Sequence, residues 1–139
     1  MADLLDRIMR LWMDPPADDE AAVAAFRELY ADPVPVNGEP MSAADLLARA
    51  RALHRAYDDL RHEPVREVDV PGTLVVAFRM RGRHTGPLST PIGDVAPTGR
   101  EVEVLTIDIL TVADGRVTEV WVVADQLGQL ARIGALLLK

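Results

Sequence analysis

The clearest pattern along the chain is a strict alternation of apolar and charged residues between positions 74 and 84. Arginines occupy the last three odd positions, 79, 81 and 83. The even positions are Leu74, Val76, Phe78, Met80, Gly82 and His84. A period of two is typical of a β-strand with one buried face. The pattern therefore predicts a long strand whose even-numbered side chains point into the protein and whose arginines lie outside.

Two β-rich runs on either side of Asp114-Gly115 predict a β-hairpin within residues 97–125. An Asp-Gly pair favours a two-residue type I′ turn, because both central residues of that turn need positive φ. If the pairing continues without interruption from this turn, Asp108 lies opposite Trp121. A three-residue loop with a bulge at Gly115 would shift the register by one residue.

Alternate residues of the hairpin point to opposite faces of the sheet. Glu101 and Glu103 suit the arginines of the preceding strand, so we expect them outside and the even positions of their own strand inside. The expected inner face carries Val104, Thr106, Asp108, Leu110, Glu119, Trp121, Val123 and Asp125. Carboxylates are costly to bury unpaired, so these acids need partners or a cavity. The expected outer face indicates a homodimer, because it exposes Leu105, Ile107, Ile109, Val120 and Val122.

Apolar residues at helical spacing predict three helices in the first half of the chain. One covers residues 3–13, a second follows the acidic residues at 18–20, and a third runs from Ser42 to about Tyr57. Ser42 and Asp45 have the spacing of a capping box, with Asp in place of the usual Glu.

The second half of the chain is expected to be mostly strands. Besides the long strands, the sequence predicts a strand over 65–70, a loop over 86–99 and a short C-terminal helix over 126–137. Helices followed by antiparallel strands indicate a single α+β domain over residues 1–139.

Composition narrows the classes of function. The chain has 139 residues, no cysteine and a net charge of −7, which argues against nucleic acid or an anionic membrane as a partner. It contains no apolar run of membrane-spanning length, and its N-terminus lacks the basic start of a signal peptide, so we expect a cytoplasmic protein. We expect no metal and no cofactor, because neither thiolates, clustered histidines nor a glycine-rich phosphate loop occurs.

Five short motifs in the second half, taken in order, resemble the SnoaL-like polyketide cyclase family of the NTF2-like superfamily. They are Gly82-Arg83-His84-Thr85-Gly86, Pro97-Thr98-Gly99-Arg100, Asp114-Gly115-Arg116-Val117, Glu119-x-Trp121-x-x-x-Asp125, and Leu127 with Gly134. The resemblance implies a cone in which a curved antiparallel sheet wraps around N-terminal helices and encloses a cavity. It also implies cofactor-independent ring closure by intramolecular aldol condensation, with an aspartate as base. That aspartate matches Asp125, and the family's Gly-x-His-x-Gly histidine matches His84.

Each candidate residue also has a structural alternative. Asp125 is the expected general base, but an aspartate directly before a helix is equally suited to be its N-cap. His84 donates a hydrogen bond to the substrate or orients an acid, or else it is a strand-end histidine whose hydrogen bonds are satisfied. Asp108 is a second cavity acid or a hydrogen-bonded structural carboxylate, and Trp121 stacks on a ligand or belongs to the core. The expected substrate-binding residues are Trp121, Asp108, Phe78, Met80, Thr106 and Val123.

The leading functional hypothesis is cyclisation of a small, hydrophobic, polyketide-like substrate, with Asp125 and His84 as the catalytic residues. The first alternative is a non-catalytic ligand-binding protein of the same fold. The second is isomerase, hydratase or hydroxylase chemistry on this scaffold, because a fold does not fix a function. The expected partners are a small hydrophobic or aromatic ligand and a second copy of the chain.

Overall fold

The computed structural model describes residues 2–136 and 138 of this chain. Its helices are α1 (Ala2–Met13), α2 (Asp19–Leu29), α3 (Ala43–Ala56) and α4 (Gln126–Arg132). The long strands are β3 (Tyr57–Val70), β4 (Thr73–His84), β7 (Glu101–Ala113) and β8 (Arg116–Ala124). The short strands are β1 (Val34–Val36), β2 (Glu39–Met41), β5 (Leu88–Thr90) and β6 (Gly93–Val95).

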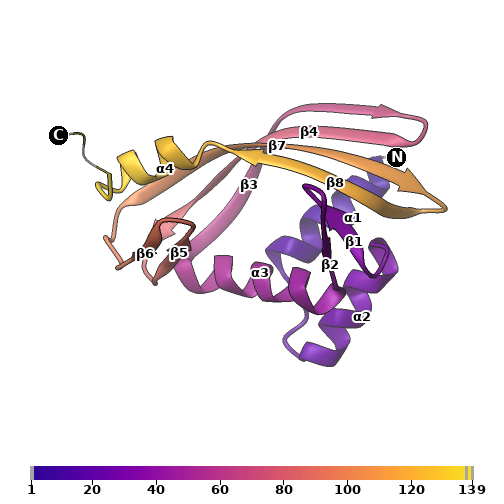
Figure 1. Cartoon of the computed structure of the whole chain (residues 1–139), viewed down its shortest axis with the longest axis horizontal. Coiled ribbons are helices and arrows are strands. Elements are labelled where there is room, and N and C mark those ends of the chain that lie inside the picture. Colours follow the sequence, from indigo (N-terminus) through magenta and orange to yellow (C-terminus); the bar gives the residue numbers. More distant parts are fainter. Residues whose placement is uncertain (1, 137, 139) are drawn as a thin grey trace.

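The six-stranded sheet is open and curved, with the strand order β2-β1-β8-β7-β4-β3. Helices α1, α2 and α3 all lie on its concave side, as Figure 1 shows. The hydrophobic core fills the space between these helices and the sheet, with Phe26, Val34 and Val76 completely buried. This arrangement confirms the predicted α+β fold.

The three N-terminal helices form where the sequence predicts them, and caps mark two of their starts. The Asp18 side chain accepts a hydrogen bond of 2.9 Å from the Ala21 amide at the start of α2. Ser42 and Asp45 form the expected capping box at the start of α3, each side chain accepting from the other residue's amide. These bonds satisfy amide groups that the first turn of a helix leaves without partners.

Strand β4 follows the predicted alternation, because its even positions from 74 to 84 are all buried. Its arginines lie outside and pair with acids on the neighbouring strand, as expected. Arg83 Nη2 lies 2.8 Å from Glu101 Oε1, and Arg81 Nη2 lies 2.8 Å from Glu103 Oε1. The alternation and these cross-strand pairs together fix the register of β4 against β7.

The turn between β7 and β8 has the predicted form. The φ angles are 53° at Asp114 and 76° at Gly115, as a type I′ turn requires, and Ala113 pairs with Arg116. The alternative three-residue loop with a bulge at Gly115 is therefore not formed.

The register nevertheless shifts by one residue, because a β-bulge lies at Thr118 of β8. A bulge adds one unpaired residue, so every later side chain of the strand moves to the opposite face. The predicted pairing of Asp108 with Trp121 is wrong, since Asp108 lies opposite Val122.

Because of the bulge, the side chains of β8 beyond Thr118 lie on the faces opposite to those predicted. Trp121 and Val123 lie on the outer face, with 47% and 74% of their surface exposed, whereas Val120 is buried and Val122 is half-buried. The faces of β7 are as predicted, since Leu105, Ile107 and Ile109 are 43–45% exposed.

The remaining elements differ from prediction in length, and the short strands β5 and β6 were not predicted. Strand β3 begins at Tyr57 and lies at the sheet edge, where proline is tolerated, and its register against β4 shifts directly after Pro64. The expected loop over 86–99 contains the β5–β6 hairpin. Helix α4 ends at Arg132, and residue 137, which the sequence placed in that helix, lies outside the described residues.

Candidate active site on the inner face of the sheet

Asp108 is the acid that the sheet turns inward. It lies on β7 between Val76 of β4 and Val122 of β8, so its strand neighbours are apolar. Its Oδ1 atom is buried, and no described residue provides a hydrogen-bond partner for it. Burial raises the pKa of Asp108 from 3.8 to about 6, because the ionised form loses solvation. The predicted alternative of a hydrogen-bonded structural carboxylate therefore does not describe this atom.

Tyr30, the residue after α2, belongs to the same region. It is 4% exposed, and its hydroxyl oxygen accepts a hydrogen bond of 2.9 Å from Trp12 Nε1. Burial raises the pKa of Tyr30, the bond from Trp12 opposes this rise, and the nearby charge of Asp108 adds to it. The hydroxyl thus stays protonated at neutral pH. Its own proton is free to be donated, and the bond that it accepts strengthens it as a donor.

Two histidines approach this region from α3 and β3. His54 Nε2 lies 2.9 Å from the Trp12 carbonyl oxygen, so Nε2 carries the proton that the carbonyl accepts. The His62 ring packs edge-on against Phe78, with the ring centroids 4.7 Å apart. Burial, and then the charge of His54, lowers the pKa of His62 from 6.5 to about 4. His62 is therefore neutral at pH 7.

We call Trp12, Tyr30, His54, His62 and Asp108 the inner polar cluster. Trp12 connects it, because its indole donates to Tyr30 and its carbonyl accepts from His54. Within the cluster, Asp108 provides a carboxyl of near-neutral pKa, and the nearby Tyr30 provides a protonated hydroxyl. Such a pair suits removal of a proton from carbon and stabilisation of the negative oxygen that results.

Three of the predicted substrate-binding residues are buried on the inner face. Phe78, Met80 and Thr106 keep only 7–8% of their surface accessible, and Val76 keeps none. The structure thus brings three of the predicted substrate-binding residues to the same face as Asp108.

His84 lies at the other end of the inner face. It is eight residues along β4 from Val76, which corresponds to about 26 Å of strand. Its Nδ1 accepts a hydrogen bond of 3.2 Å from the Thr98 amide and lies 3.0 Å from the Thr98 hydroxyl. Burial lowers the pKa of His84. The structure therefore does not bring His84 together with Asp108.

Asp125 is exposed and caps α4. Its Oδ1 atom accepts a hydrogen bond of 2.9 Å from the Gly128 amide. The prediction that Asp125 points into the interior is wrong, because the bulge at Thr118 reverses the faces of β8. The N-cap alternative is confirmed. For the same reason Trp121 and Val123 do not line the inner face.

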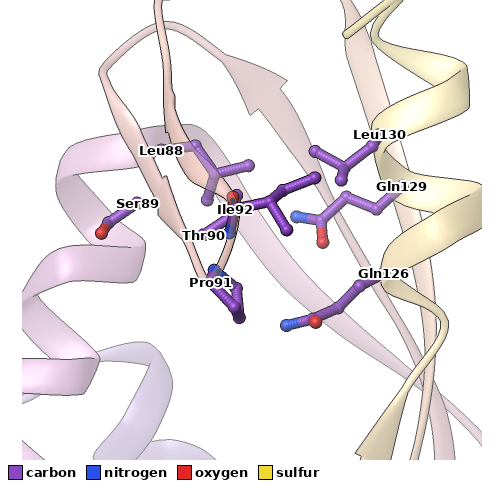
Figure 2. A pocket seen from close by; sticks show the side chains of 8 residues that line it. All are labelled: Leu88, Ser89, Thr90, Pro91, Ile92, Gln126, Gln129 and Leu130. Carbon is purple, nitrogen blue, oxygen red and sulfur yellow. Dashed lines mark hydrogen bonds between the residues drawn. The ribbon is translucent and has the colours of Figure 1, made fainter. Parts of the chain in front are cut away.

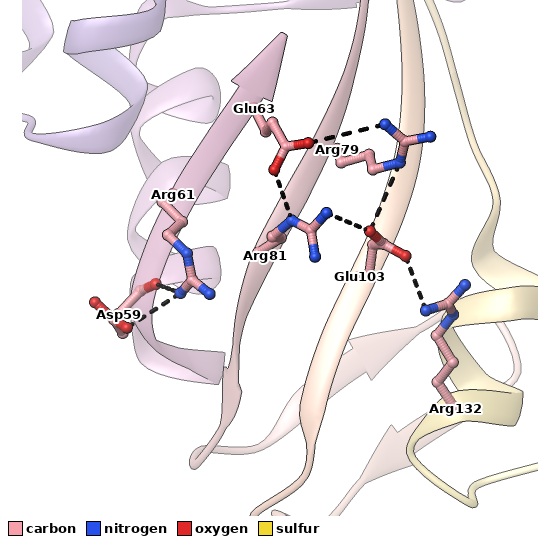
Figure 3. Close-up of polar contacts among 7 residues, drawn as sticks. All are labelled: Asp59, Arg61, Glu63, Arg79, Arg81, Glu103 and Arg132. Carbon is pink, nitrogen blue, oxygen red and sulfur yellow. Dashed lines mark hydrogen bonds and ion pairs between the residues drawn. The ribbon is translucent and has the colours of Figure 1, made fainter. Parts of the chain in front are cut away.

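Two surface hollows lie away from the inner polar cluster. A pocket of about 150 Å³ separates the β5–β6 hairpin from α4, and Figure 2 shows Ile92, Gln129 and Leu130 pointing into it. A groove of about 360 Å³ lies on the charged part of the outer face. There Glu103 pairs with Arg81 at 2.8 Å and with Arg132 at 2.9 Å, which ties α4 to the sheet (Figure 3).

No three His, Asp or Glu side chains among residues 2–136 and 138 are grouped so that they could hold a metal ion. None of the helices in this part of the chain has the length and apolarity that crossing a bilayer requires.

Sequence reasoning missed four members of the inner polar cluster: Trp12, Tyr30, His54 and His62. Trp12 and Tyr30 occupy apolar helical positions, where core packing is the usual role. His62 precedes Pro64 in a stretch with no clear alternation. The one available signal was the polar group that each aromatic residue carries, because a buried Tyr or Trp usually finds a partner.

The chain belongs to the SnoaL-like polyketide cyclase family, whose sequence model matches residues 3–133. No curated protein matches the chain significantly.

Solved structures of similar fold include TsrD from Streptomyces laurentii, with a TM-score of 0.79 and 20% identity over 97% of this chain and 95% of that one. IdmH from Streptomyces antibioticus, a candidate polyketide cyclase, has a TM-score of 0.73 and 21% identity over 96% and 97% of the two chains. AclR from Streptomyces galilaeus, a candidate hydroxylase, has a TM-score of 0.71 and 21% identity over 99% of each. At such identities the likeness establishes the NTF2-like fold.

Proposed function

We propose that this protein catalyses an intramolecular aldol cyclisation of a small, oxygenated, hydrophobic substrate, with Asp108 as general base. The observation that carries the proposal is the buried Oδ1 atom of Asp108, which has no partner among the described residues and belongs to a carboxyl with a pKa of about 6. A base works best when its pKa lies near the working pH. Membership of the SnoaL-like polyketide cyclase family supports the reaction class.

In the proposed reaction the Asp108 carboxylate removes a proton from a carbon flanked by two carbonyl groups. The resulting enolate carbon attacks a second carbonyl carbon of the same molecule, which forms the new C–C bond and leaves an alkoxide. The alkoxide then takes the proton back from Asp108, so no atom is gained or lost. Tyr30 donates a hydrogen bond to the enolate oxygen, a role that its protonated and Trp12-supported hydroxyl suits.

The test is turnover of linear polycarbonyl substrates, followed by mass spectrometry and absorbance of the cyclised product. Asp108→Asn keeps the shape of the side chain but removes the base, so we expect turnover to fall roughly 10²–10⁴-fold. The matched control is Asp125→Asn, which alters an exposed capping aspartate and should leave turnover within about twofold of wild type. Undiminished turnover by Asp108→Asn, or a large loss in the control alone, would overturn the assignment.

Ligand binding without catalysis is the second candidate. It is favoured by one observation, which is that Asp108 lines neither of the two surface hollows. Tight binding of the polycarbonyl compounds with no cyclised product from wild-type protein would support this second function. The similarity to a candidate hydroxylase makes oxygen insertion a further reaction to assay in the same screen.

A further inference from the structure

Three buried polar atoms on the inner face have no hydrogen-bond partner among the residues that the structure describes: Asp108 Oδ1, His62 Nδ1 and His84 Nε2. His84 lies at the C-terminal end of β4, and the other two, Asp108 and His62, lie at a distance from one another along the sheet. Buried polar atoms are nearly always paired, so each exception needs an explanation. The proposed base accounts for Asp108, but nothing in the reaction described above uses His62.

The His62 ring is held in a defined orientation. Phe78 packs against it edge-on, at 4.7 Å between centroids and 78° between ring planes. His54, the neighbour named with burial as a cause of the lowered pKa of His62, already directs its own Nε2 proton at the Trp12 carbonyl. The His62 Nδ1 atom is thus fixed by packing and has no competing partner, which is the condition for recognising a ligand atom.

The protonation state of His62 limits what it can bind. A neutral imidazole offers one N–H donor and one lone pair, and the tautomer decides which of them stands at Nδ1. Either tautomer pairs with a hydroxyl group at Nδ1. The tautomer that carries its proton on Nδ1 also pairs with a carbonyl. A carboxylate or phosphate would instead favour a charged imidazolium, which burial at this position opposes.

The strand register sets the distance between the two atoms. Asp108 pairs with Val76, and His62 pairs with Met80, so the two rows lie four residues, or about 13 Å, apart along β4. They also flank β4 on opposite sides, which adds about 10 Å across the strands. A ligand that touches both must be elongated, with an oxygen atom near each end.

We propose that His62 is a positioning residue that binds a hydroxyl or carbonyl oxygen at the far end of an elongated, flat, polyoxygenated ligand. Binding at His62 places the reacting carbon of that ligand beside Asp108. This inference rests on the proposed function for the identity of the reacting end, but the recognition by His62 can be tested by binding alone. Phe78, between the two rows, supplies an aromatic surface for the body of the ligand.

The test compares two probes, 2,6-dihydroxyanthraquinone and 2-hydroxyanthraquinone, which differ only in the second terminal hydroxyl. Calorimetry gives the two dissociation constants, and quenching of Trp12 fluorescence in a Trp121→Phe background reports that the probe lies on the inner face, since the chain has two tryptophans. We expect wild-type protein to bind the dihydroxy probe about tenfold more tightly, a preference typical of one buried hydrogen bond.

Two substitutions separate recognition from packing. His62→Phe keeps the ring but removes the nitrogen, so the tenfold preference should disappear; His62→Asn keeps a polar atom at the Nδ1 position and should retain most of it. An equal preference in His62→Phe and wild type, or no binding of either probe by the wild type, would overturn the inference. Nitrogen-15 shifts of His62 that respond to the dihydroxy probe test the same contact in the unmutated protein.

The same measurements distinguish this inference from the proposed function. Asp108→Asn should keep the probe preference while losing turnover, because it leaves His62 intact. Asp108-dependent turnover without any effect of His62 on probe preference would reject the positioning role alone. Retained probe preference with no turnover in the wild type would reject the proposed reaction alone.

Discussion

At the scale of single residues, the inner face contains two ionisable groups with opposite pKa shifts. Burial raises the pKa of Asp108 to about 6 and lowers that of His62 to about 4, so that both groups favour their neutral forms. At pH 7 Asp108 has nevertheless lost its proton, and it is held as an anion in a place that disfavours the charge. That cost in stability is typical of a functional group, because a structural residue at the same site could be apolar.

The first residue-scale prediction concerns the pH dependence of turnover. Because the base must be ionised, kcat/KM should fall below an apparent pKa of about 6, where Asp108 is protonated in the free protein. Initial rates between pH 4.5 and 8.5 check this expectation. Tyr30 and His62 do not give such a limb, since Tyr30 stays protonated and His62 stays neutral over this range. A flat profile across pH 6 would contradict the role of Asp108.

The second prediction concerns stability against pH. The folded pKa of Asp108 is raised, so its contribution is greatest below pH 3.8 and is lost as the pH rises through about 6, a change of about 3 kcal/mol. The folded pKa of His62 is lowered, so its contribution is present above pH 6.5 and is lost as the pH falls through about 4. The change from His62 should be smaller, because solvent partly screens the ring.

Between pH 4 and 6.5 the contribution of Asp108 falls with rising pH while that of His62 rises. The free energy of unfolding of the wild-type protein should therefore vary little in this range. In Asp108→Asn only the His62 contribution remains, so the free energy of unfolding should fall on acidification. In His62→Phe only the Asp108 contribution remains, so the free energy of unfolding should rise on acidification. Urea unfolding of the three proteins at pH 4, 5, 6 and 7 measures this. If the free energy of unfolding changed with pH in the same way in both variants, the opposite pKa shifts assigned to Asp108 and His62 would be contradicted.

At the scale of elements, one extra residue in β8 determines which side chains reach the interior. The bulge at Thr118 turns Val122 toward Asp108 and sends Trp121 outward. It also leaves Asp125 at the end of the strand, where its carboxylate caps α4. The capping bond and the Arg132–Glu103 ion pair at 2.9 Å together dock this short helix on the sheet.

The element-scale prediction follows from the cap. Asp125→Ala should lower the free energy of unfolding by about 1 kcal/mol, and Asp125→Asn by only a few tenths, because Asn is an equally good N-cap. Chemical denaturation of both variants against wild type measures the difference. Equal effects of the two substitutions would argue against a capping role for Asp125.

At the scale of the whole molecule, the outer face of the sheet carries an exposed apolar patch that no helix of the described part covers (Figure 1). Two rows of apolar side chains cross β4, β7 and β8: Val75, Ile109 and Trp121 in one, Ala77, Ile107 and Val123 in the other. Beside the patch the charges of both signs are already paired with one another (Figure 3). A second copy could therefore approach this face despite a net charge of −7 per chain.

We accordingly propose a homodimer that buries this patch, with the bulge-shifted Trp121 and Val123 in place of the Val120 and Val122 expected from sequence. A stable dimer buries about 800 Å² per chain, so the interface would have to include the adjoining paired charges as well as the patch. Ile107→Glu should give a monomer by sedimentation velocity at micromolar concentration. The matched control is Ile92→Glu on the β5–β6 hairpin, which is 77% exposed and lies off this face. A monomeric wild-type protein would contradict the proposal.

Local patterns in the sequence determined the elements and most of the sheet. Helical periodicity and the Ser42 capping box placed α1 to α3, and alternation in β4 fixed its inner side, because side-chain direction in a strand depends only on neighbouring positions. The Asp114-Gly115 turn was also readable, since positive φ at two adjacent residues restricts the residue types.

Tertiary structure alone decided the candidate site. No local rule requires a bulge at Thr118, yet it removes Asp125 and Trp121 from the interior and leaves Asp108 there. Likewise, Trp12, Tyr30 and His62 look like ordinary core or strand residues until the packing of the helices on the sheet buries their polar groups. The physical reason is that a pKa or an unpaired atom depends on burial and on neighbours distant in sequence, which pairing and packing set.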